Sequence, residues 1–191
     1  MDFLFSIFTE QNYLPESIPT LWIRKIGQYP PFQRNPDKEV FNYLLDEDRE
    51  NYQKALANLS ISYGIGAYAY FRRIIENEIK RIVKDISEID YDGVDEVRKA
   101  KSKYDQDHQM ASLIDSISAF LPKSLMATGY NPLKVLHQQT SGGLHVLSED
   151  ECLAKARDVD SLLSYTIKSV SSLKFEYIGL QNAIKNLTRP K

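Results

Sequence analysis

The sequence predicts an all-α protein, a helical bundle of about five main helices with an irregular N-terminal arm. From residue 38 onward, apolar residues recur at intervals of three and four, which is the spacing of one helix face. No β-hairpin turn signal and no strand–helix–strand alternation appears along the chain. With 191 residues and 42% hydrophobic content, the chain is long and apolar enough for one domain with a sizeable core.

The arm covers residues 1–37, and the bundle covers residues 38–191. Five prolines interrupt the arm, so we expect no sheet there larger than a short hairpin. Residues 21–27 are typical of a short extended segment, and we expect its apolar side chains to pack across the helical body. The alternative is an arm exchanged between two copies, or a strip that docks a partner.

Helical spacing predicts helices over most of residues 38–86, 107–121, 132–140 and 149–185. Three of their starts carry N-cap signals. Asp37 precedes the first, and Asn131 followed by Pro132 precedes the third. Ser148 and Glu151 have the spacing of a capping box at the start of the last helix. We expect residues 169–172 to break or bend that last helix.

A cluster of small residues should allow close helix packing. Gly64, Gly66, Ala67 and Ala69 lie within one helical stretch and would let another helix approach closely. The Gly-x-Gly within it is not a dinucleotide-binding loop, because the third glycine is missing and no strand precedes it.

Charge and cysteine content exclude several classes of protein. The 24 basic and 26 acidic residues give a net charge of −2, so no global field attracts nucleic acid. The densest basic run lies at residues 98–103 and is flanked by acids; it is typical of a solvated face, with RNA contact as the alternative. The single cysteine, Cys152, excludes an internal disulfide and suits a small apolar residue in a helix better than a nucleophile. One cysteine and three scattered histidines do not predict a metal site, and we expect no cofactor.

The N-terminal segment is apolar but is not typical of a membrane signal. It carries Asp2 and Glu10, lacks a positive leading region, and is too short to span a bilayer. No other segment approaches ~18 apolar residues. We therefore expect no membrane contact and a cytoplasmic location.

One corner of the predicted bundle concentrates reactive chemistry. The helix that begins at Asn131 runs into Ser141, followed by two glycines, and His145 follows on the turn before Ser148. The histidine would thus sit on a glycine-rich corner beside the positive N-terminus of the last helix. An imidazole titrates near neutral pH, so His145 is a candidate general acid or base.

A family resemblance follows from the order of these features. A helix with Arg72, Arg73 and Glu76 comes first, then a core helix, then the glycine-containing turn with His145 and a capped final helix. Over roughly residues 50–185, this plan resembles the HEPN superfamily of small helical domains, in a diverged bacterial branch. The resemblance implies a bundle of four to five helices, often a homodimer. In many members it also implies a metal-independent ribonuclease of toxin–antitoxin or phage-defence systems.

The family signature places an arginine four to six residues before a histidine. His145 matches the histidine, but no arginine lies between Arg98 and Arg157, and His137 is the nearest replacement, with Lys134 close to it. An arginine from the earlier helix would then have to supply the fixed positive charge. The candidate catalytic residues under this resemblance are His145, His137, Arg72 and Arg73.

Three functions remain open from the sequence. The first is a noncatalytic HEPN-like helical module for dimerisation or for docking a partner or RNA. The second is a metal-independent ribonuclease or nucleotide-binding effector of a toxin–antitoxin or phage-defence system. The missing arginine favours the first, whereas a basic cleft beside His145 built by Arg72, Arg73 and Lys134 would favour the second. A thiol enzyme using Cys152 is a remote third reading.

Overall fold

The computed structural model describes residues 2–10, 20–29, 35–141 and 147–188, and the fold within these ranges is almost entirely helical. Two strands precede the helices: β1 (Asp2–Glu10) and β2 (Thr20–Tyr29). The helices are α1 (Lys38–Tyr43), α2 (Asp46–Ser60), α3 (Gly64–Glu88), α4 (Val94–Asp107), α5 (Met110–Ile117), α6 (Pro132–Ser141) and α7 (Glu149–Leu187), with a short 3-10 turn after α5. The predicted all-α class and the predicted helical stretches are confirmed.

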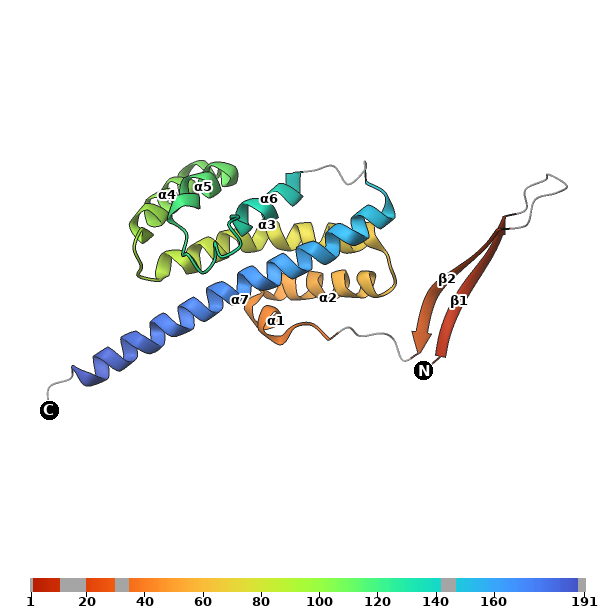
Figure 1. Ribbon diagram of the computed structural model, residues 1–191, viewed down its shortest axis with the longest axis horizontal. Helices are drawn as coiled ribbons and strands as arrows, with labels where there is room; N and C mark the ends of the chain where they lie inside the picture. The colour runs from red at the N-terminus through yellow and green to blue at the C-terminus, as the bar shows by residue number, and fades with distance from the viewer. Residues whose placement is uncertain (1, 11–19, 30–34, 142–146, 189–191) are drawn as a thin grey trace.

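The N-terminal arm contains an antiparallel hairpin that projects from one end of the helical body (Figure 1). Ile7 pairs with Ile23, and an irregularity in register falls between Leu4 and Phe5. Ile23 is 62% exposed and Ile26 is 52% exposed, so the expected packing of residues 21–27 across the bundle is wrong for these two side chains. Among the described side chains, the hairpin meets the body where the Arg24 guanidinium lies 5.6 Å from the Tyr63 ring centre.

Helix α3 is the centre of the bundle. Its 25 residues carry a stripe of isoleucines at helical spacing, and the side chains of this stripe are fully buried. Helices α2 and α7 lie along it, and α6 and α4 pack on its remaining sides (Figure 1). The core therefore surrounds α3, and any site near α3 has a rigid support.

Helices α3 and α7 begin at the same end of the bundle and run parallel. Gly64 packs against the first turn of α7, where a Cβ atom at position 64 would overlap the backbone of Glu149 and Leu153. At the other end, Lys174 of α7 donates to Asp85 of α3 over 2.6 Å. Ala67 is fully buried, so the small-residue surface predicted from the sequence does permit close helix packing.

The predicted helix caps are present. The Asp37 carboxylate accepts from the backbone of Glu39, and the Asn131 side chain accepts from Leu133 at 3.0 Å. At the start of α7, the Ser148 hydroxyl accepts from the Glu151 amide, while the Glu151 carboxylate accepts from the Ser148 amide at 2.8 Å. These bonds satisfy helix-end amides that have no partner within the helix.

Helix α7 runs for 39 residues without interruption, so the expected break at residues 169–172 is absent. Its first half is buried against the bundle up to Val170, and its second half extends beyond the body (Figure 1). None of the helices in the described ranges is long and apolar enough to cross a membrane.

Candidate functional site

The glycine-rich corner joins α6 to α7, and residues 142–146, including His145, lie outside the described residues. Both flanks of the corner are described. Three helices converge on its α6 side: α3 contributes Tyr68 and Arg72, α6 contributes Gln139 and Thr140, and α7 contributes Lys155.

These side chains bind the last turn of α6. The Tyr68 hydroxyl donates to the Gln139 carbonyl at 3.1 Å, and the Arg72 guanidinium donates to the carbonyl of Thr140. The Lys155 ammonium donates to the Gln139 side chain at 3.4 Å. The last carbonyls of a helix lack partners within the helix, so Tyr68 and Arg72 satisfy two of them. Arg72 and Lys155 also place two cations at the start of the corner.

The other flank of the corner joins two helix N-termini. The Glu149 carboxylate, in the first turn of α7, accepts a hydrogen bond from the Gly64 amide at the start of α3. Three acidic residues occupy that first turn of α7. Their negative charge offsets the partial positive charge of two adjacent helix starts. An anion that approached this end of the two helices would therefore be repelled by these carboxylates.

Cys152 is a structural residue of α7. Its side chain is fully buried, and burial raises the pKa of its thiol, with smaller contributions from Glu149 and Glu151. A thiol held protonated and away from solvent is a poor nucleophile. The interpretation of Cys152 as a small apolar residue agrees with this environment.

Of the three remaining candidate catalytic residues, Arg72 has a side-chain contact at the corner. Arg72 reaches the end of α6. Arg73 is exposed and lies near Lys54 of α2. The pKa of Lys54 is raised, mainly by its hydrogen bond to Glu50, and the nearby charge of Arg73 opposes that rise. His137 is half-buried, and its backbone carbonyl accepts from the Thr140 hydroxyl at 2.7 Å.

Lys134 lies in the first turn of α6, at the opposite end of this helix from the corner. It forms an ion pair with Asp115 over 2.7 Å. The basic cleft of Arg72, Arg73 and Lys134 that would favour a ribonuclease is therefore not assembled by the described side chains.

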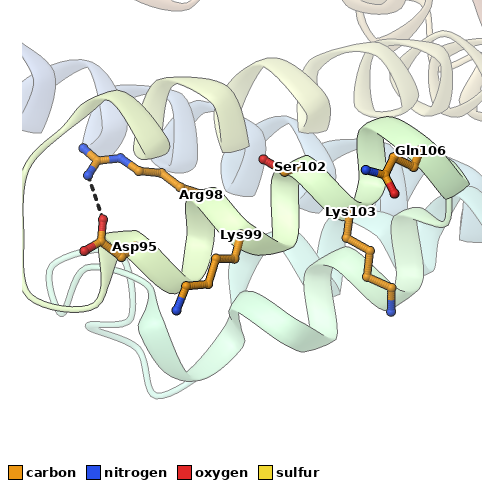
Figure 2. Close-up of a pocket in the computed structure, with 6 residues that line it drawn as sticks. All are labelled: Asp95, Arg98, Lys99, Ser102, Lys103 and Gln106. Atoms are coloured by element: carbon orange, nitrogen blue, oxygen red, sulfur yellow. Dashed lines mark hydrogen bonds and ion pairs between the residues drawn. The ribbon is translucent and has the colours of Figure 1, made fainter.

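The basic run of α4 lines an open, shallow depression (Figure 2). Arg98 pairs with Asp95 at 3.0 Å, as drawn in Figure 2, and the next two lysines of the run also have carboxylate partners within one turn. Lys103 has no such ion pair among the described residues. Local neutralisation of three of the four cations favours a solvated face over a phosphate-binding one.

A buried polar cluster between α2 and α3 was not predicted from the sequence. Glu78 and Asp48 are almost completely buried, and one oxygen of each carboxyl group has no hydrogen-bond partner among the described residues. The Leu45 amide donates to Glu78 at 3.2 Å, and the Asn77 amide group donates to Asp48 at 3.0 Å. Two neighbouring carboxyl groups away from water favour the protonated form of one of them, and the charge of Asp48 contributes to raising the pKa of Glu78.

Burial is the main cause that raises the pKa of Glu78, to about 7, and burial also raises the pKa of Asp48. Arg81 lies 3.8 Å from Glu78, but its guanidinium also covers the Tyr43 ring at 4.3 Å, so it offsets the buried charge only in part. The Tyr43 hydroxyl continues the network by donating to Asp85 at 2.7 Å.

One sequence signal could have located this cluster. Glu78 follows Ile74 and Ile75 and precedes Ile82 at helical spacing, which places a carboxyl group within the apolar stripe of α3.

The described residues contain no group of histidine, cysteine and acidic side chains arranged to hold a metal ion. No protein-family model, curated protein or solved structure shows a significant match to the chain.

Proposed function

We propose that this chain is a noncatalytic HEPN-like helical module that binds another protein chain. One observation carries the proposal: two elements, the β1–β2 hairpin and the second half of α7, extend beyond the bundle with large apolar side chains exposed. Exposed apolar surface of this extent is typical of interaction sites.

The hairpin supports the proposal because its large apolar side chains are exposed wherever the structure describes them. The exposed large apolar residues among its described side chains are Leu4, Phe5, Ile7, Ile23 and Ile26. A two-stranded hairpin is marginal in water unless a further strand or helix covers it, and its outer strand edges are open to pairing. A bound chain would supply that cover.

Self-association is the first thing to measure. We expect sedimentation velocity of the full chain to show a concentration-dependent species larger than the monomer, and incubation with mixed RNA to leave the RNA intact. A chain that sediments as a monomer at every concentration and cleaves RNA would refute the module.

A second candidate function is RNA cleavage, and the position of Arg72 favours it. Arg72 approaches the corner that holds His145, where it supplies a cation in place of the absent signature arginine. If this function holds, His145→Ala abolishes RNA cleavage while the melting temperature is nearly unchanged. Arg73→Ala is the matched control, since Arg73 is exposed near α2 and should leave cleavage intact.

A further inference from the structure

Apolar and small residues recur along α7 at strictly alternating intervals of four and three. The first six of these positions are Cys152, Ala156, Val159, Leu163, Thr166 and Val170, and all six are buried. The pattern continues without interruption through Leu173, Tyr177, Leu180, Ile184 and Leu187. A strict seven-residue repeat of this kind is the seam of a coiled coil, in which a second helix packs along the stripe.

Within the bundle, α3 is the helix that covers this seam. Lys174 reaches both Asp85 and Glu88, so the last turn of α3 lies level with residue 174 of α7. Beyond that level the seam is uncovered in the monomer. Leu180 is 62% exposed and Leu187 is 86% exposed.

The uncovered tail, residues 175–187, is a poor helix by its own propensity. It contains two asparagines and Gly179, and a Cβ at position 179 would meet nothing within 4 Å. Isolated helices of about this length are marginal in water even with favourable sequences. A helix that packed along the seam would supply the stabilisation that the tail lacks.

We propose that the occupant of this seam is the α7 tail of a second copy of the chain, packed antiparallel. The inference rests on the proposed interaction function and names its partner. A parallel second α7 would run into α3, which fills the same side of α7 up to residue 174. An antiparallel tail places the two bundles at opposite ends and sets Leu180 against Ile184 of the second copy.

Charge favours the same orientation. Beyond Lys174, the charged residues of the described tail are Glu176 and Lys185. Antiparallel packing with Leu180 against Ile184 brings Glu176 within about one helical turn of Lys185 in the second copy. Parallel packing would instead set each Glu176 level with a second Glu176 and each Lys185 level with a second Lys185, so antiparallel packing is the arrangement that places unlike charges at similar levels along the seam.

The size of the seam predicts a reversible dimer. Four side chains from each tail, Tyr177, Leu180, Ile184 and Leu187, would be covered. At about 60–120 Å² each, eight side chains bury on the order of 500–1,000 Å², below the ~1,200 Å² of standard stable interfaces. The dimer should therefore dissociate on dilution.

The first test compares two glutamate substitutions by sedimentation velocity over a range of concentrations. Ile184→Glu places charge in the seam and should weaken dimerisation at least about tenfold. Phe175→Glu is the matched control, because Phe175 is 80% exposed and lies on the opposite side of the helix from the seam. Equal losses in both variants would overturn the seam, since they would indicate nonspecific apolar association.

The second test determines orientation by disulfide formation under mild oxidation. Leu180→Cys mixed with Ile184→Cys should form cross-linked dimers, whereas either variant alone should not. Cross-linking of each variant alone would indicate a parallel pair and overturn the proposal. The parent protein, whose single cysteine Cys152 is buried, should form no cross-linked dimer and is the control for both variants.

Two further results separate this inference from the function on which it rests. Dimers that survive Ile184→Glu but are lost in Ile23→Glu would overturn the α7 seam and leave the interaction module intact with the hairpin as its surface. A chain that is monomeric at all concentrations and co-sediments with phosphatidylcholine vesicles would overturn the seam, because the tail would then bind lipid.

Discussion

Glu78→Gln should stabilise the protein at alkaline pH. The buried Glu78 carboxyl has its pKa raised to about 7, from a usual value of 4.5, mainly by burial. Because the folded state binds this proton more tightly than the unfolded state, Glu78 favours folding fully below about pH 4.5. That contribution is lost as pH rises through about 7.

The magnitude follows from the pKa difference. At about 1.36 kcal/mol per pKa unit, ionising Glu78 in the folded state costs about 3 kcal/mol above pH 8. A glutamine has the same shape, keeps the acceptor for the Leu45 amide, and can donate to Asp48 without a charge. The variant should therefore match the parent near pH 4.5 and exceed its stability by about 3 kcal/mol at pH 9.

Urea unfolding at several pH values measures this difference directly. Glu76→Gln on the same helix is the matched control, since Glu76 is exposed and the substitution should shift the curve little at any pH. If the Glu78→Gln and parent curves run parallel from pH 4.5 to 9, Glu78 is not protonated in the folded state and the reasoning is refuted.

Three further substitutions or reactions test the packing. Ser148→Ala should lower the free energy of unfolding by about 0.5–2 kcal/mol because a helix-end amide loses its acceptor; an unchanged urea midpoint would show that the cap contributes nothing. Ala67→Leu should overpack the fully buried contact near α7 and cost about 1–3 kcal/mol, so a variant as stable as the parent would contradict that packing. Cys152 should react with a thiol reagent only at the rate of unfolding, and fast labelling of the native protein would show the thiol to be accessible.

Local signals predicted the helical part of the fold well. The caps at Asp37, Asn131 and Ser148 form because short polar side chains satisfy helix-end amides wherever the chain starts a helix, and this depends only on neighbouring residues. The small residues at Gly64 and Ala67 likewise have one common use inside a helix, which is close approach of another helix.

The failures arise where packing partners decide the outcome. Residues 169–172 read as a break, but the buried Val170 holds that part of α7 against the bundle and keeps it helical. The apolar residues of the hairpin were expected to pack on the bundle because apolar side chains are usually buried. The sequence alone does not specify whether this bundle or another chain buries them.

The candidate site was predicted only in part. Arg72 and Arg73 are adjacent in sequence, yet a helix turns about 100° between them, so one reaches the corner and the other faces solvent. The Glu78–Asp48 pair was missed because a carboxylate on a helix is usually solvated, and its burial depends on how α2 lies against α3.

The parallel course of α3 and α7 has a consequence for biosynthesis. Gly64 and Leu153 touch in the folded bundle, yet nearly half of the chain must be synthesised between them before that contact can form. During translation the isoleucine side chains of α3 therefore stay partly exposed until α7 has left the ribosome and can pack against them. Delayed burial of this kind slows folding and lengthens the time in which a nascent chain can aggregate, so production should respond strongly to chaperones and to growth temperature.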